Sequence, residues 1–366
     1  MTGFVQSIIT ILLFIFILGA LVVIHELGHF VTARLMRVKV LEFGVGFPPR
    51  AKVLRNKGET IYTLNWLPIG GFVKLEGEDG DGADDPRSFS AQSLPRRLII
   101  LVAGVAMNVL LAFVIFTGIA LFADPAVGVT IGAVEPGSPA AAAGLVAGDT
   151  IVSLNGEPHA AFSPDKPTDA LRAHAGQTVT LGIKSADGST KDVQATLRPA
   201  SELDANHGAL GISTSAAVVL PDPIHYSVVE AMQIGVQRTV DALGLIVGGL
   251  ASLVEAVINR PTEAPPVSGP VGIATQLGDV FWQLGPVFTL YVAGVLSANL
   301  AVVNILPFPP LDGGRMLMIT LKRFFGERMS VRAEQMTYMV GFVFLFAFLI
   351  WVTGFDIVRS LSGGGT

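Results

Sequence analysis

Four apolar stretches dominate this sequence, and each is long enough, or nearly so, to cross a lipid bilayer as a helix. A helix needs about 20 apolar residues to cross the hydrocarbon core, where every backbone polar group must be satisfied within the segment. Only 14% of the 366 residues are charged, compared with about 25% in ordinary soluble domains. We therefore expect a polytopic α-helical membrane protein with four transmembrane helices, at about 4–35, 98–122, 284–306 and 336–352.

The distribution of Lys and Arg predicts the orientation of these helices, because short cytoplasmic loops carry an excess of both. Residues 34–97 hold 11 of the 24 Lys and Arg, residues 315–335 hold 5, and the much longer 124–284 holds only 7. We expect the first two segments to be cytoplasmic, and both termini and the region after residue 124 to be extracytoplasmic. The net charge of −5 gives no support for nucleic-acid binding. With no cysteine, any metal must be held by His and carboxylate groups.

One further segment is ambiguous. Residues 242–258 are nearly apolar, but the stretch is short, contains Glu255 and includes three glycines. As a fifth span it would place the basic loop 315–335 outside, against the charge bias. We favour an interfacial or partly re-entrant amphipathic helix, with a true span as the alternative.

The region between the second and third spans predicts a small α+β domain. Strands are expected at 129–134, 150–154, 179–184 and 192–197, and short helices at 140–143 and 168–175, separated by Gly- and Pro-containing turns. The stretch PGSPAAAAGLVAGDTIVSLNGEP resembles the PDZ domains of bacterial proteases. A generic small β-domain is the alternative.

The cytoplasmic segment predicts a β-hairpin, with strands 52–54 and 61–64 on either side of a polar turn. An edge strand here, at Tyr62 and Thr63, could hold an unwound substrate segment by β-strand addition. Residues 43–49 and 67–73 are apolar and rich in turn-forming residues, and could dip into the membrane face.

The first apolar stretch ends in His25-Glu26-Leu27-Gly28-His29, an HExxH pattern. Residues four apart lie on one face of a helix, so both histidines can reach one metal ion, and Glu26 is placed to act as a general base toward water. Ionisable groups inside a membrane span are costly and usually mark function. The pattern therefore predicts a hydrolytic zinc site within the membrane.

A catalytic zinc needs a third protein ligand, and Asp312 is the best candidate. It follows a proline-rich break at the end of the third span, and two glycines after it allow close approach of the backbone. His29 lies five residues before Arg34 and Asp312 three before Arg315, so both ligands should reach a similar depth below the cytoplasmic boundary. Asn304, at the end of the same span, could contact substrate near the scissile carbonyl; the alternative is that its amide simply hydrogen-bonds a neighbouring helix.

HELGHF, NILPFPPLDGG, AGVAMN and SGPVGIA together resemble the site-2 protease family of intramembrane zinc metalloproteases, in the branch of the bacterial regulator of sigma-E protease. The resemblance implies zinc ligands at His25, His29 and Asp312, Glu26 as general base, and a substrate-facing role for Asn304 and the hairpin. Two departures are a single PDZ-like region instead of a tandem pair, and the absence of a proline at Val105 or Ala106.

By this resemblance we expect regulated cleavage of single-span membrane proteins, such as anti-sigma factors, in the bacterial cytoplasmic membrane. A membrane scaffold with an inactive metal site, or a metal transporter, are the alternatives. Intact Glu26 argues against the first, and the lack of internal repeats against the second. The expected order of segments is 1–35, first span; 36–97, cytoplasmic loop; 98–122, second span; 124–200, PDZ-like domain; 201–283, linker and amphipathic helix; 284–314, third span; 315–335, cytoplasmic loop; 336–355, fourth span.

Overall fold

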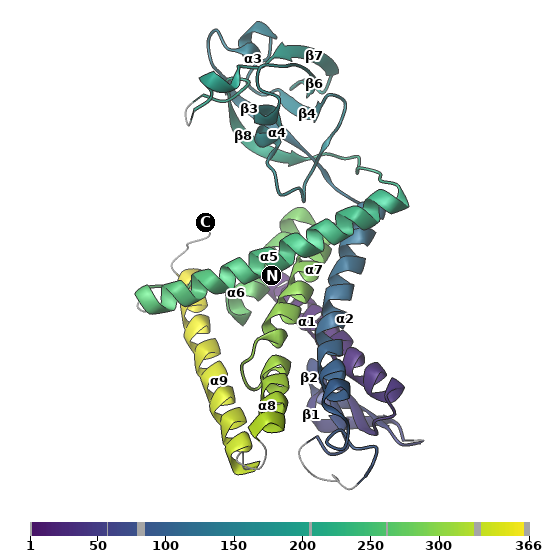
Figure 1. The fold of residues 1–366 in the computed structure, drawn as a ribbon. Helices are drawn as coiled ribbons and strands as arrows, with labels where there is room; N and C mark the ends of the chain where they lie inside the picture. Colours follow the sequence, from purple (N-terminus) through teal and green to yellow (C-terminus); the bar gives the residue numbers. More distant parts are fainter. Residues whose placement is uncertain are drawn as a thin grey trace. The chain divides into compact units, whose positions relative to one another are not determined.

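The computed structural model describes residues 2–56, 58–78, 85–204, 207–260, 263–325 and 331–361. It divides into two compact units (Figure 1), residues 1–117 with 233–366, and residues 118–232. Part of the predicted cytoplasmic loop 315–335, residues 326–330, lies outside the described residues.

Helices form most of the first unit. Their bounds are α1 (Thr2–Leu35), α2 (Leu94–Phe122), α5 (Val228–Asn259), α6 (Pro270–Leu284), α7 (Pro286–Ile305), α8 (Asp312–Phe325) and α9 (Val331–Leu361). Large apolar side chains such as Phe4 and Phe16 on α1 are exposed, which suits a surface that faces lipid rather than water.

Five helices in the described part of the chain are long and apolar enough to cross a membrane: α1, α2, α5, α7 and α9. Four of them coincide with the predicted spans. The fifth, α5, contains the ambiguous segment 242–258 and qualifies by length and composition alone. The protein is membrane-embedded, and the count of four spans stays a prediction that depends on α5.

A small sheet connects α1 to α2. Its two long strands, β1 (Val40–Arg55) and β2 (Ile61–Leu75), each fold over, so that four segments pair side by side. Segment 42–45 pairs with 61–64 on one side and with 71–74 on the other, and 50–55 pairs with 62–65. The hairpin expected from 52–54 and 61–64 is present. Residues 43–49 and 67–73, which are rich in turn-forming residues, lie within these strands, because they pair with segments distant in sequence. Their expected place at the membrane face stays a prediction.

The second unit is a β-domain with two short helices. Its sheet has the order β5-β3-β4-β6-β7, and β8 pairs with β3. Eleven buried apolar residues form its core, among them Ile131, Leu181 and Ile183. The bounds are β3 (Ala126–Val134), α3 (Pro139–Ala142), β4 (Thr150–Leu154), β5 (His159–Ala160), α4 (Pro167–Ala173), β6 (Thr178–Lys184), β7 (Thr190–Thr196) and β8 (Ile212–Val219).

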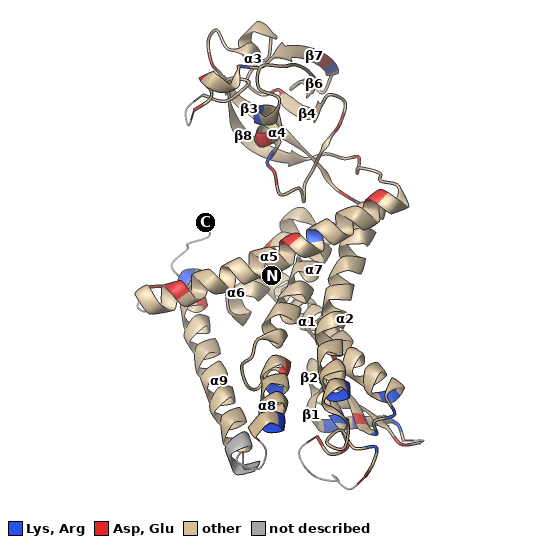
Figure 2. Cartoon of the chain, viewed as in Figure 1, with Lys and Arg blue, Asp and Glu red and all other residues tan. Residues whose placement is uncertain are grey.

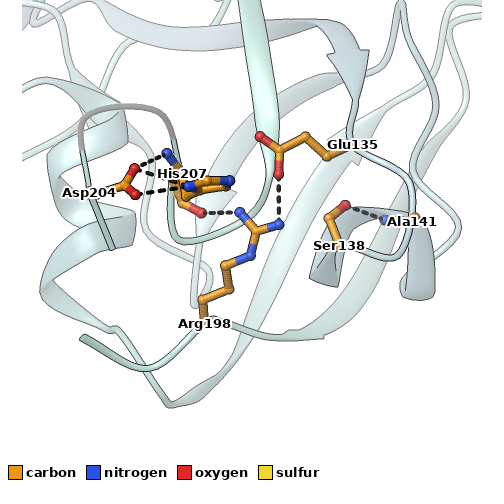
Figure 3. Close-up of polar contacts among 7 residues, drawn as sticks. Glu135, Ser138, Ala141, Arg198, Asp204 and His207 are labelled. Carbon is orange, nitrogen blue, oxygen red and sulfur yellow. Dashed lines mark hydrogen bonds and ion pairs between the residues drawn. The ribbon is translucent and has the colours of Figure 1, made fainter. Parts of the chain in front are cut away.

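The predicted end of this domain at residue 200 is too early. β8 pairs with β3 along its whole length, and the chain before it is bonded to the domain, since Ala140 donates its backbone N–H to the carbonyl of Leu210 at 3.0 Å. Arg198 donates to Glu135 at 2.6 Å and to the carbonyl of Gly208 at 3.1 Å (Figure 3). These contacts make residues 207–219 part of the domain rather than a linker.

Candidate metal centre

Three of the predicted residues meet at one point in the first unit. His25 and His29 lie on α1, and Asp312 is the first residue of α8. His25 Nε2 lies 2.9 Å and His29 Nε2 3.2 Å from Asp312 Oδ2, and the two Nε2 atoms are 3.1 Å apart. Both histidines are buried. Two imidazole nitrogens and one carboxylate oxygen facing a common point form a donor set that suits zinc and leaves a fourth position open.

A short loop between α7 and α8 brings the start of α8 back to the end of α7, and Asp312 there lies beside the histidines of α1. Backbone hydrogen bonds from Leu311 to Phe308 and from Arg315 to Leu311 stabilise the turn. A Cβ atom on Gly313 would collide with the carbonyls of Ile305 and Leu306. Glycine is therefore required where the first turn of α8 packs against the end of α7, and this close packing positions the Asp312 carboxylate.

Residues of α2 contact the Nδ1 atom of each histidine, on the side of the ring opposite the metal-binding Nε2. His29 Nδ1 lies 2.8 Å from the backbone carbonyl of Ile100, which can accept a hydrogen bond only from a protonated Nδ1. That tautomer leaves Nε2 unprotonated and free to bind a metal. The backbone of α2 thus selects the metal-binding form of His29.

His25 has a different partner, the Asn108 amide, with 3.2 Å between His25 Nδ1 and Asn108 Nδ2. Asn108 is fully buried, and its Oδ1 has no hydrogen-bond partner among the described residues. Amide oxygen and nitrogen can be exchanged without moving other atoms. The exchange breaks no other hydrogen bond, and it lets Nδ1–H donate to Oδ1. His25 Nε2 is then free for a metal, so the buried amide fits a zinc-bound histidine.

The two helices approach closely at this point because glycine lies on both. A Cβ on Gly28 would overlap the backbone of Ala103, and a Cβ on Gly104 would overlap the imidazole rings of His25 and His29. Asn108 stands out in the sequence as a polar residue in an apolar span. Its partner and the role of Gly104 could not be inferred from the sequence, since both depend on how α1 and α2 cross.

Glu26 lies next to the metal-binding group and beside the small sheet. It is half-buried on α1, and a Cβ on Gly71 of β2 would lie 3.7 Å from its Cγ atom. Segment 71–74 pairs with 42–45 on one side. A strand edge therefore passes close to the residue predicted to act as the base.

The remaining predicted site residues lie elsewhere. Asn304 is half-buried in the last turn of α7, and its role stays a prediction. Tyr62 and Thr63 do not form a free edge, because their segment pairs with 42–45 and with 50–55. Thr63 donates to Glu42 Oε1 at 2.8 Å, and the Tyr62 ring contacts Phe30. The edge expected at Tyr62 and Thr63 is thus an interior strand.

Comparison with known proteins gives the family. The model of peptidase family M50 matches residues 13–348. A protein of Clostridium acetobutylicum named as a zinc metalloprotease is 33% identical over 98% of this chain and 100% of its own length. The zinc metalloprotease RasP of Geobacillus kaustophilus is 27% identical over 97% of this chain and 99% of its own. The regulator of sigma-W protease RasP of Bacillus subtilis is 27% identical over 96% of this chain and 98% of its own length. The chain therefore belongs to peptidase family M50, the site-2 protease family, and is an intramembrane zinc metalloprotease.

Proposed function

We propose that this protein hydrolyses peptide bonds within the transmembrane segments of single-span regulatory membrane proteins, such as anti-sigma factors. The observation that carries the proposal is the buried group of His25, His29 and Asp312, near the end of an apolar helix with Glu26 beside it. A relative that is named a regulator of sigma-W protease supports a regulatory class of substrate.

We assign the zinc to His25, His29 and Asp312. When bound, zinc supplies a Lewis acid that acidifies water and polarises the scissile carbonyl. Glu26 accepts the proton from the attacking water and passes it to the leaving amine, a general base role that typically contributes about 10²–10⁴-fold. The Ile100 carbonyl and the Asn108 amide orient the two imidazoles throughout. We place Asn304 near the scissile carbonyl, where its amide can stabilise developing charge.

We place the site near the cytoplasmic face of the membrane. Figure 2 shows a group of Lys and Arg around β1 and another on α8, with separate basic positions on α5 and at the end of α9. Arg34 lies one turn beyond His29 on α1, and Arg315 one turn beyond Asp312 on α8. This charge distribution supports a cytoplasmic sheet and an extracytoplasmic β-domain, with both termini outside. Water can then reach the site from the cytoplasm without crossing the bilayer.

Substrate must unwind before cleavage, because the carbonyls of a helix are engaged in internal hydrogen bonds. We propose that the opened segment adds to the edge of β2 at 71–74, which passes Glu26, rather than at Tyr62 and Thr63. Alternate N–H groups of an edge strand point outward. Proline placed in turn at Phe72 and Val73 should therefore lower cleavage in at least one variant while zinc is retained.

Val53→Pro is the matched control, since segment 50–55 is the opposite edge of the same sheet. Unchanged cleavage by both β2 variants, or an equal loss in the control, would contradict the addition of substrate to the edge at 71–74.

The function itself is tested with the full chain in proteoliposomes that contain a single-span protein. We expect fragments whose new ends map within the apolar span, loss of cleavage on chelation, and recovery when zinc is returned. New ends confined to soluble segments would contradict cleavage within the membrane.

A further inference from the structure

A cavity of about 470 Å³ opens where α1 ends, and arginine side chains line much of it. Arg34 comes from the last turn of α1, Arg37 from the turn after it, Arg55 from the end of β1, and Arg87 from the loop before α2. All four are exposed and therefore charged. We call this the arginine cavity. Arg34 follows the metal ligand His29 by five residues on α1, but none of the four arginines has a part in the mechanism above.

The charges in the arginine cavity are poorly compensated. Glu59 is the single acidic residue among its described lining residues, and it is paired with Arg87 at 2.7 Å. Arg34, Arg37 and Arg55 have no acidic partner within the described parts of the chain; Arg34 instead lies over the Phe30 ring at 5.7 Å. Like charges gathered around one cavity repel each other unless an anion joins them.

Arg37 adopts a conformation that ordinarily belongs to glycine. Its φ is +62°, and it follows α1 at the position where the chain turns out of the helix. Val38 donates to the carbonyl of Ala33 at 2.9 Å and Arg37 to that of Arg34 at 3.0 Å, the hydrogen-bond pattern of a Schellman motif. Glycine is usual here because a side chain makes the left-handed region unfavourable. An arginine at this position is costly locally, and a binding role for its guanidinium explains why it is there.

The location of the arginine cavity indicates the source of the anion. α1 is an apolar span, and Arg34 is its last basic residue. Leu35 beside it is 78% exposed, so apolar surface adjoins the charged cavity. Guanidinium groups match phosphate oxygens in a bidentate geometry. Basic pockets at the end of a span are suited to anionic lipid head groups. Arginine near a membrane boundary is common by itself, but here α1, the turn after it, the end of β1 and the loop before α2 each bring an arginine to one cavity.

We propose that the arginine cavity binds the phosphate of an anionic phospholipid head group through Arg34, Arg37 and Arg55. The shared chemistry is a phosphate group, which a soluble phosphate could also supply. The test titrates the full chain in neutral detergent with short-chain phosphatidylglycerol, with phosphatidylcholine and with inorganic phosphate, and counts bound ligands by native mass spectrometry.

The informative variant is the double substitution Arg34→Gln with Arg37→Gly. Glycine at residue 37 suits the positive φ, so the end of α1 is retained while two guanidinium groups are lost. Arg323→Gln on α8 is the matched control, because it removes the same kind of charge from an exposed residue outside the cavity. Zinc content is measured in each variant to show that the chain is folded.

We expect phosphatidylglycerol to bind the unaltered chain about tenfold or more tightly than phosphatidylcholine. The double variant should lose this preference, and Arg323→Gln should keep it. Equal binding of the two lipids, or an equal loss in the control, would overturn the proposal. Displacement of phosphatidylglycerol by an equal concentration of inorganic phosphate would overturn the lipid as the source of the anion.

Discussion

The metal centre and the β-domain are stabilised in opposite ways. At the metal centre, polar side chains are buried and a few specific contacts hold them, such as those from the Ile100 carbonyl and the Asn108 amide. In the β-domain, eleven buried apolar residues share the stabilisation. Buried polar groups are costly unless each is satisfied, whereas an apolar core distributes the effect of any one change. Substitutions should therefore act on chemistry in the first region and on folding in the second.

The largest effect is expected from His29→Ala, which removes one of the three metal-binding side chains. Zinc should be lost from the full chain and cleavage should fall below detection, while the β-domain stays folded. Metal analysis together with limited proteolysis of residues 118–232 measures both. His174→Ala in the β-domain is the matched control, and it should retain full zinc; equal zinc loss in both variants would remove the contrast between the regions.

A core substitution should show the reverse pattern. Leu181 is completely buried in the β-domain, and Leu181→Ala should destabilise that domain by about 2–5 kcal/mol through lost burial and a cavity. The change is measured by heating the full chain and recording the temperature at which the β-domain becomes sensitive to protease. Zinc content should be unaffected. A parallel loss of zinc would show that the two regions are energetically coupled.

Substitution of Asn108 tests whether the hydrogen-bond partner of His25 Nδ1 affects zinc affinity. Asn108→Leu removes the amide and should weaken zinc affinity by about 10–100-fold, measured by competition with a chelator. Asn108→Asp keeps an oxygen that accepts from His25 Nδ1 and should retain zinc much better. Equal losses in the two variants would mean that the amide nitrogen, not its oxygen, faces His25.

Removal of the helix cap at Ser138 should have a smaller, local effect on stability. Its hydroxyl oxygen accepts a hydrogen bond from the backbone N–H of Ala141 at 3.2 Å (Figure 3). Ser138→Ala should destabilise the β-domain by about 1 kcal/mol, visible as a modest shift in its thermal unfolding. Ser138→Gly should cost less. A loss as large as that of Leu181→Ala would indicate that α3 contributes more than its cap.

The smallest effect is expected for the pH dependence of the stability of the sheet in the first unit. Burial alone would raise the pKa of Glu42, but hydrogen bonds from Arg50 and Thr63 outweigh it and hold that pKa below its ordinary value of 4.5. Because this pKa is lower in the folded state, the ionised Glu42 with its partner Arg50 stabilises the sheet at pH values above 4.5. The contribution is lost as the pH falls through the folded pKa. Protease sensitivity of residues 40–75 should rise on acidification, and Glu42→Gln should weaken this dependence; an unchanged profile would contradict it.

The sequence predicted elements that depend on local pattern. The spans follow from apolar length, and the two histidines follow from helical periodicity. Asp312 could be proposed because it follows the proline break at the end of the third span, and because the two glycines after it allow close approach of the backbone. Contacts that depend on long-range pairing were not predictable: Asn108 meets His25 only because α1 and α2 cross at two glycines, Gly28 and Gly104.

The same reason explains where the strands differ from the prediction. The local pattern predicts an edge at Tyr62 and Thr63 because only their hairpin partner is close in sequence, while 42–45 covers their other side. It does not predict β8, because its partner β3 precedes it by nearly the whole domain. In 43–49 and 67–73, residues typical of turns lie in strands that pair with distant segments.

The central claim is that Glu26 acts as the base for hydrolysis at a zinc held by its neighbours. The most direct measurement compares Glu26→Gln with the unaltered chain in proteoliposomes containing a single-span substrate, with zinc content determined on the same samples. Glu255→Gln on α5 is the matched control, since it makes the same change in another apolar helix. We predict full zinc and a loss of cleavage of about 10²-fold or more in Glu26→Gln alone. Normal cleavage by Glu26→Gln with zinc retained would contradict the account.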